Sequence, residues 1–370
     1  MPMPARSPDE HHRASTPLEL FFDLVFVVAI AQAAAGLHRA VLAHQIGHGL
    51  LGFTMVFFAI WWAWMNFTWF ASAYDPDDTI YRITVLVQLT GALILAAGLA
   101  AAFDRMDFTA VVVGYVVMRV AMVSQWLRAA RHNPEYATSA KRNAIGITIL
   151  QLGWIGMLAV PSPTVLIVFI VLALGEFAVP IWAERHRPTP WHAGHITERY
   201  GLFTIIVLGE SILAATLAIQ AALAAGTALT SLLTLIVGGL LIVYSAWWLY
   251  FDDLDPARMS VTSLRRGFVW AYGHALVFAA TAAIGAGLAI AVDQGTGHTA
   301  ISLRTASFAI AIPVALFLTM QWLLNDLLPV RPVQRPWLLP FMAVLVLLTP
   351  FGPAPASVMG LLMVAAVGLR

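Results

Sequence analysis

The sequence predicts an all-α fold, a polytopic bundle of about 10–12 transmembrane helices. Apolar residues make up 60% of the chain and charged residues only 11%, whereas an average soluble domain carries about twice that charge. The mean hydropathy is +0.82. Apolar runs of about twenty residues, the length that a helix needs to cross a bilayer, recur along the whole chain.

Each apolar run is a candidate span, and the first is too long for a signal-peptide core and lacks a small-residue cleavage site. We expect a polar cytoplasmic tail over 1–17, a first helical half over 18–184 and a second over 185–370. The last two runs are short, and they form either two thin spans or one re-entrant hairpin. The candidate spans are 18–41, 46–73, 80–102, 108–128, 144–160, 164–183, 200–219, 229–251, 268–292, 301–324, 337–349 and 356–369.

The distribution of basic residues predicts that both termini are cytoplasmic. With the tail inside, only Arg39, Arg105 and Arg304 of the 20 Lys and Arg residues fall in outer loops, and Arg119 lies within a span. Cytoplasmic loops carry the excess of Lys and Arg in membrane proteins.

Composition also limits the function classes. The net charge of +1 gives no field that would attract nucleic acid, and the absence of cysteine excludes disulfides and thiolate metal sites. Nucleotide-binding and hydrolase motifs are missing, so we expect no cofactor, and an enzyme is the less favoured class. The expected partners are the lipid bilayer, a small solute and protons, and the oligomeric state is open.

A weak internal repeat relates the two halves. The run from Glu19 to Val28 is similar to the run from Glu198 to Val207, and each following span ends in paired tryptophans and an acidic turn with proline. Six helices separate the copies, which predicts two six-helix parallel repeats as in some transporters. Chance similarity among apolar helices is the alternative.

Two of these runs also carry a family resemblance. Leu18-Glu-Leu-Phe-Phe-Asp23-Leu-Val-Phe-Val and Glu198-Arg-Tyr-Gly-Leu-Phe-Thr-Ile-Ile-Val-Leu-Gly-Glu210-Ser resemble the signatures of the bacterial low-temperature-requirement A (LtrA) family. The resemblance extends to about Leu324. It implies a multi-pass protein of the bacterial inner (cytoplasmic) membrane. The family is named for a growth phenotype, so the resemblance implies topology and no mechanism.

Ionisable residues inside the spans are the candidate transport or proton sites, because a charge at bilayer depth costs at least ~2.5 kcal/mol. Glu210 is about ten residues into its helix and thus near mid-depth, and we expect Gly209 to let a neighbouring helix approach. Asp23 follows Glu19 by one turn. It is either a proton or cation site or a partner for a cytoplasmic-side arginine.

Arg119 and Glu176 also lie at mid-depth in their spans. We expect Arg119 to pair with Glu176 or Glu210, and we favour a Glu–Arg–Glu cluster around a cavity over a purely structural pair. His274 suits a proton relay by its ordinary pKa, although a hydrogen-bonded packing residue is the more common outcome.

The remaining polar residues favour helix caps or gates. Thr16-Pro17-Leu18-Glu19 has the pattern of a capping box, and Asp-Pro turns end helices. A zinc site at His192, His195 and Glu198 is a weak alternative, and we predict no metal site. Tryptophans near the inner helix ends, among them Trp62, Trp64, Trp247 and Trp248, are typical of an interfacial belt. The predicted cap or gate residues are Glu19, Glu198, Asp75, Asp78, Asp252, Arg82 and Arg266.

The residues favour a secondary transporter of a small solute, in a proton-coupled form among others. A membrane-embedded enzyme or lipid-acting protein is the first alternative, and a structural or sensory membrane protein is the second. No residue is predicted as catalytic.

Overall fold

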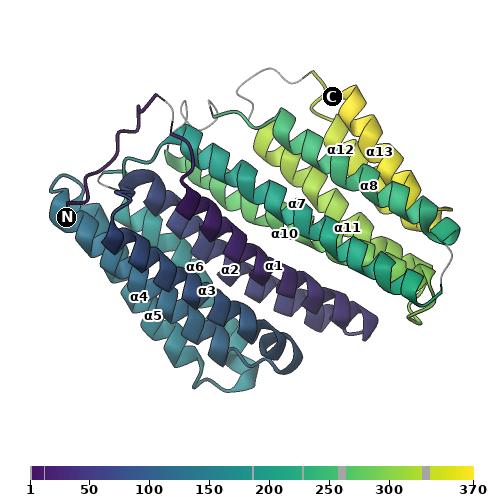
Figure 1. Cartoon of the computed structure of the whole chain (residues 1–370), viewed down its shortest axis with the longest axis horizontal. Coiled ribbons are helices and arrows are strands. Elements are labelled where there is room, and N and C mark those ends of the chain that lie inside the picture. Colours follow the sequence, from purple (N-terminus) through teal and green to yellow (C-terminus); the bar gives the residue numbers. More distant parts are fainter. Residues whose placement is uncertain (1, 12, 186, 227–228, 257–263, 327–333) are drawn as a thin grey trace. The chain divides into compact units, whose positions relative to one another are not determined.

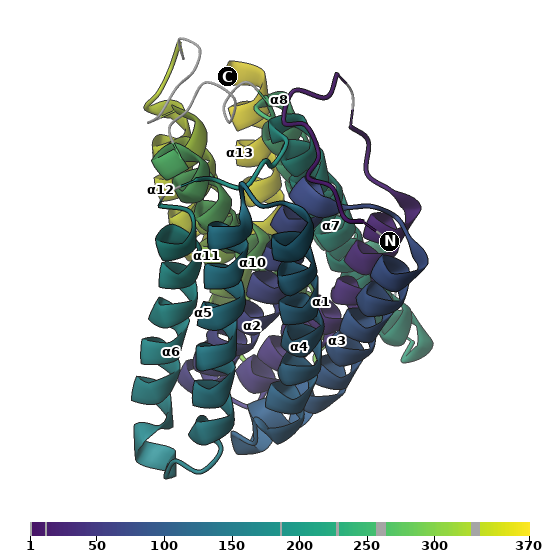
Figure 2. The same ribbon diagram turned by 90° about the vertical axis from the view of Figure 1, so that its left-hand side faces the viewer.

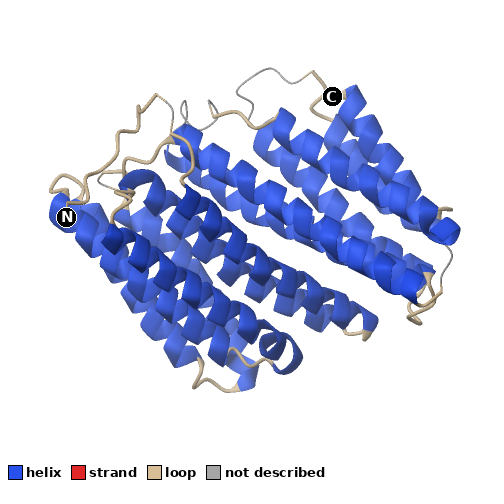
Figure 3. Cartoon of the chain, in the orientation of Figure 1, coloured by secondary structure: helices blue, strands red, loops and turns tan. Residues whose placement is uncertain are grey.

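A computed structural model describes residues 2–11, 13–185, 187–226, 229–256, 264–326 and 334–370. In this described part every regular element is helical (Figure 3). The chain divides into two compact units, which are described separately below. The first unit comprises Met1–Gln32 and Thr54–Arg199, and the second comprises Ala33–Phe53 and Tyr200–Arg370.

The first unit contains the start of α1, most of α2, and a series of antiparallel helices in which α3 packs on α4, α4 on α5 and α5 on α6. Figure 2 shows α4, α5 and α6 running alongside one another. Gly91 and Gly114 set the closest crossing, because a Cβ on Gly114 would lie 2.4 Å from the Gly91 carbonyl oxygen. The helices are α1 (Pro17–Leu42), α2 (Ile46–Tyr74), α3 (Thr79–Arg105), α4 (Thr109–His132), α5 (Ala137–Met157) and α6 (Ser162–Ala183).

In the second unit α10 packs on α11, α8 on α13 and α11 on α12 (Figure 1). Small residues again allow close approach, since a Cβ on Gly360 would lie 2.7 Å from the Gly238 carbonyl oxygen. The elements are α7 (Ala193–Ala224), whose first residues belong to the first unit, α8 (Leu229–Asp252), α10 (Leu264–Gly295), α11 (Leu303–Gln321), a π-helical turn (Trp322–Asp326), α12 (Leu338–Leu348), a 3-10 turn (Thr349–Phe351) and α13 (Pro355–Leu369).

The outward faces of these helices are apolar, as the bilayer requires. On α5 and α6, Ile149, Leu152, Ile167, Val171 and Leu174 are each more than 60% exposed. A contiguous apolar surface of this kind is rare on a soluble monomer. Lipid chains are its natural solvent.

The predicted polytopic all-α fold is confirmed. Among the described residues, nine helices are long and apolar enough to cross a membrane. The helices α12 and α13 have 11 and 15 residues, or about 16 and 22 Å of length, against a hydrocarbon core of ~30 Å. Whether they form two spans or a re-entrant hairpin stays a prediction, as do the orientation, the repeat and the division into halves at residue 184.

Candidate functional site

The start of α1 carries two acids that are completely buried. Thr16 and Glu19 form both hydrogen bonds of a capping box, with the Glu19 carboxylate accepting from the Thr16 amide at 2.7 Å and the Thr16 hydroxyl accepting from the Glu19 amide at 3.3 Å. Asp23 lies one turn further along the same helix face. Both acids have a relative exposure of 0%, so their charges need partners inside the protein.

Arg199, in the second turn of α7, provides the main counter-charge. Its Nε and Nη2 donate to Asp23 at 3.2 and 2.5 Å, and its Nη1 lies 3.3 Å from the Glu19 carboxylate. The indole of Trp64 on α2 donates to the same Asp23 carboxylate at 2.7 Å. One buried acid therefore joins α1, α2 and the start of α7. We call Glu19, Asp23, His195 and Arg199 the charged cluster.

His195 and Arg13 complete the surroundings of Glu19. The His195 Nε2 lies 3.1 and 3.2 Å from the two Glu19 oxygens. Arg13 lies 3.5 Å from Glu19 and donates to the carbonyls of Ala71 and Ser72 at the end of α2. Burial lowers the pKa of Arg13, but a guanidinium remains charged in proteins. Glu19 and Asp23 thus face Arg13 and Arg199. The two negative and two positive charges balance when the His195 imidazole is neutral.

Residues 2–11 and 13–16 lie across the ends of several helices of the first unit. The Asn133 side chain donates to the Met3 carbonyl at 2.8 Å, and the Ser15 amide donates to the Glu198 carboxylate at 3.1 Å. Glu198, one of the predicted cap or gate residues, therefore holds this segment against α7. The contacts place the segment as a strap over the charged cluster.

A second buried cluster surrounds Glu176 on α6, and we call Trp62, Tyr115, Arg119, Trp154 and Glu176 the Glu176 cluster. The carboxylate accepts hydrogen bonds from the indoles of Trp62 at 2.7 Å and Trp154 at 3.1 Å, and from the Tyr115 hydroxyl at 3.0 Å. Arg119 donates to the carboxylate at 3.2 Å and to the Tyr115 hydroxyl at 2.5 Å. Four donors therefore fix the position of the Glu176 side chain.

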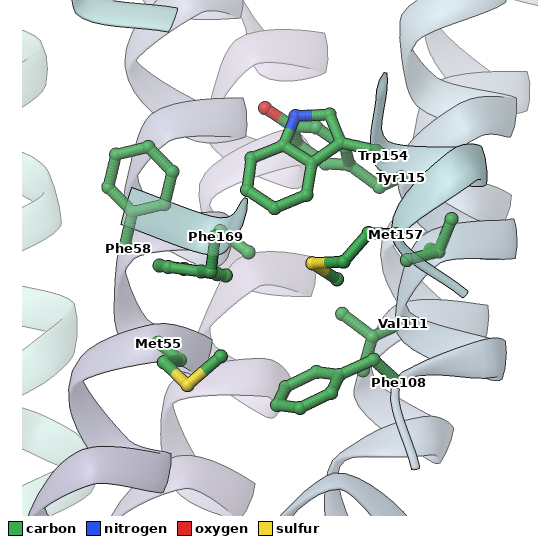
Figure 4. Close-up of a pocket in the computed structure, with 10 residues that line it drawn as sticks. Met55, Phe58, Phe108, Val111, Tyr115, Trp154, Met157 and Phe169 are labelled. Atoms are coloured by element: carbon green, nitrogen blue, oxygen red, sulfur yellow. The ribbon is translucent and has the colours of Figure 1, made fainter. Parts of the chain in front are cut away.

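An apolar cavity of about 20 Å³ adjoins this cluster, which is room for one or two atoms of the size of water. Tyr115 and Trp154 form one wall, and their polar atoms point away from the cavity (Figure 4). The other walls are apolar, so the cavity is expected to stay dry. The full lining is Met55, Phe58, Ala59, Phe108, Val111, Val112, Tyr115, Trp154, Met157 and Phe169.

Glu210 lies half-buried on α7 in the second unit. It has no hydrogen bond or ion pair with a described residue of its own unit. The close approach predicted at Gly209 is wrong, since a Cβ there would meet nothing within 4 Å. The approach occurs two residues further on instead, where Ser211 donates to the Thr281 carbonyl at 2.9 Å and packs against Gly285.

Arg119 therefore has Glu176 as a partner, whereas the part of the predicted Glu–Arg–Glu cluster that involves Glu210 stays a prediction. His274 is buried in the second unit, and its Nδ1 lies 2.7 Å from the Trp270 carbonyl. The rings of Tyr200 and Trp270 lie 5.1 and 4.0 Å from the imidazole. This aromatic setting fits the packing interpretation of His274.

The first acidic turn is tied to arginines of two helices. Asp78 caps α3 by accepting from the Tyr81 amide at 2.9 Å and pairs with Arg128, while Asp77 pairs with Arg82 at 2.7 Å. These arginines lower the pKa of both carboxyl groups. Asp75 is different, because burial, followed by the nearby Glu19 charge, raises its pKa to about 6.

The second acidic turn is described only in part. Asp252 is exposed at the end of α8, and the side chain of Arg266 lies outside the described residues. The proposed gate between them stays a prediction.

The interpretation of two tryptophans as interfacial anchors needs correction. Trp62 and Trp64 are fully buried donors to carboxylates, not interfacial anchors, whereas Trp247 and Trp248 are exposed as a belt requires. The zinc alternative is not supported, because among the described residues no three His, Cys, Asp or Glu side chains lie close enough together to hold a metal ion. His192 contacts the Glu10 carbonyl instead, and His195 contacts Glu19.

Sequence reasoning missed Glu184 and Gln151. Glu184 follows the end of α6, where it was indistinguishable from a solvated loop acid, yet it is 6% exposed. It accepts from the Thr189 hydroxyl at 2.8 Å, and burial raises its pKa to about 7. Gln151 is buried on α5 with neither amide atom bonded to a described residue. A polar residue in an apolar run was the available signal for it.

The helices and the two buried clusters define a polytopic membrane protein with ionisable groups held inside the bundle. The sequence profile of the bacterial low temperature requirement A protein (LtrA) matches residues 14–369. The chain belongs to this family. It is also 28% identical over 278 residues to an uncharacterized protein of Rhizobium meliloti (strain 1021), a match that covers 71% of this chain and 65% of that protein.

Proposed function

We propose that the chain is a secondary transporter of a small solute and that it couples solute movement to protons through Glu210. The distribution of counter-charges carries the proposal. Asp23 and Glu176 each have an arginine partner, whereas Glu210 has none among the described residues of its unit. A fixed ion pair locks helices together, but an acid without a partner among the described residues of its own unit does not hold the helices of that unit together.

An acid that has no counter-charge inside a bilayer has two states of low free energy. It is neutral while apolar groups surround it, because an ionised carboxylate there costs at least ~2.5 kcal/mol. It releases its proton when a change of conformation exposes it to water. This alternation is the step that proton-coupled transport needs. The contact of Ser211 with α10 gives the adjacent turn of α7 a firm attachment.

The first unit would serve as the rigid part of the transporter. Its charged cluster joins α1 to the start of α7 through salt bridges whose separation would leave buried charges unpaired, and Trp64 joins α2 to Asp23 by a hydrogen bond. We further propose that the protein lies in the bacterial inner membrane with both termini cytoplasmic, which the distribution of Lys and Arg supports.

Proton flux tests the proposal. The protein is reconstituted into liposomes that contain a pH-sensitive dye, a pH gradient is imposed, and cationic, anionic, zwitterionic and uncharged solutes are added in turn. We expect a solute-dependent proton flux that Glu210→Gln abolishes, since glutamine imitates the neutral acid and cannot release a proton. Glu135→Gln is the matched control, because Glu135 is 56% exposed and pairs with Arg187 at the surface.

Equal flux in the wild type and Glu210→Gln would refute the role of Glu210. If Glu210→Gln changes thermal stability and no solute drives flux, the structural or sensory alternative is favoured. Chemical modification of lipids by the reconstituted protein would favour the enzyme alternative.

A further inference from the structure

The seam between α4 and α5 changes from apolar to polar along its length. The rings of Tyr115 and Trp154 meet across it, 6.0 Å apart. One turn away on each helix, towards the cavity, are Val111 and Met157. One turn away in the other direction are Arg119 and Gln151. Because α4 and α5 are antiparallel neighbours, Arg119 and Gln151 lie at about the same level.

Both polar residues of this level have unused hydrogen-bonding atoms. Arg119 is 1% exposed and Gln151 6% exposed. The Arg119 Nε and Nη1, and both amide atoms of Gln151, are buried without a partner among the described residues. Several unsatisfied polar atoms on two facing helices are unusual in a protein core. They point to a group that binds between them.

The chemistry of that group follows from the donors and the charge. Arginine offers only donors, so the bound group needs an oxygen that accepts hydrogen bonds. The Gln151 side chain can both accept a hydrogen bond at its oxygen and donate one from its NH2 group. Arg119 and Glu176 already balance one another, so an added charge would be uncompensated at bilayer depth. The group is therefore uncharged.

We propose that the Arg119–Gln151 level is the binding site for an uncharged solute of only a few heavy atoms that carries an amide-like or hydroxyl oxygen. This assignment rests on the proposed function, whose solute it specifies. Water is the other source of an uncharged oxygen, and the test separates it from a solute.

Thermal unfolding in lipid nanodiscs tests the proposal without any transport assay. The probes are formamide and acetamide, and propane, which is similar to acetamide in size, is the probe without an oxygen. We expect both amides to raise the melting temperature of the wild type in a saturable manner, by roughly 2 °C or more. Gln151→Leu abolishes this rise, and propane gives a smaller one. The double variant Gln88→Leu, Gln125→Leu is the control, because it removes a bonded glutamine pair of the same unit and keeps the amide response.

Three outcomes would overturn the proposal. If Gln151→Leu is more stable than the wild type and neither amide shifts the melting temperature of the wild type, the Gln151 amide is unsatisfied in a dry seam and binds no solute. If Gln151→Leu is less stable and no amide shifts the wild type, the level holds water or a direct Arg119–Gln151 bond. If wild type and Gln151→Leu respond equally, the amides bind elsewhere. Loss of proton coupling in Glu210→Gln with an intact amide response would separate the two proposals.

Discussion

Glu184 gives a quantitative prediction about pH and stability. The carboxyl group is buried, one oxygen accepts from Thr189, and the other has no partner among the described residues. Its pKa is raised from 4.5 to about 7. The folded state therefore binds more protons than the unfolded state between these values, and the free energy of unfolding must fall as pH rises.

The size of this effect follows from the shift. A difference of about 2.5 pKa units at 1.36 kcal/mol each is about 3 kcal/mol. The penalty is absent below about pH 4.5 and complete above about pH 7. Glu184→Gln keeps an acceptor for Thr189 and cannot ionise, so the variant should exceed the wild type by about 3 kcal/mol at pH 8 and match it at pH 4.

The assay is unfolding of the reconstituted protein by a denaturing detergent, followed by far-UV circular dichroism, from pH 4 to pH 8. Glu135→Gln controls for loss of a nearby surface carboxylate, and its profile should follow that of the wild type. If Glu184→Gln has the same pH profile as the wild type, or is less stable at pH 8, the carboxylate is solvated and the reasoning fails.

Three further predictions concern packing and charge. Arg199→Met should lower the free energy of unfolding by about 3–5 kcal/mol, because Asp23 and Glu19 lose their counter-charge. Adding Asp23→Leu should recover part of that loss in a double-mutant cycle. Additive effects of the two substitutions would contradict the pairing. Gly114→Ala should lower the melting temperature, because its Cβ would lie 2.4 Å from the Gly91 carbonyl oxygen. Gly156→Ala on α5, whose Cβ would meet nothing within 4 Å, should leave the melting temperature unchanged or raise it. A lower melting temperature for Gly156→Ala than for Gly114→Ala would disprove the close crossing. Arg13→Ala should expose Arg6 to rapid trypsin cleavage because the bonds to the end of α2 are lost, and Arg82→Ala, which removes an exposed pair, should not.

Hydropathy and helix length were enough to predict the helices, because in a bilayer every backbone polar group must be bonded within its own segment. The main differences arise at helix starts. The start of α7 was predicted at Tyr200, but the helix begins at Ala193. Arg199 lies in this additional part of the helix, where it is buried and pairs with Asp23. The sequence had suggested only that Arg199 belongs to an inner loop.

The pairing of buried charges needed information that one sequence does not contain. Depth along a helix is readable from residue counts, and it correctly placed Arg119 near the level of an acid. It leaves open which helix faces which, so Glu176 and Glu210 were equal candidates. The tryptophans were misjudged for a related reason, since Trp62 and Trp64 are suited equally to an interface and to a carboxylate that only the fold brings near.

The strap formed by residues 2–11 and 13–16 has a consequence for biogenesis. Ser15 bonds to Glu198, 183 positions later in the chain. At the usual rate of synthesis, roughly 10–35 s separate the appearance of these two residues from the ribosome. During that interval the acids at the head of α1 lack Arg199, so this stretch of nascent chain should depend on the insertion machinery, or on protonation, until translation reaches α7.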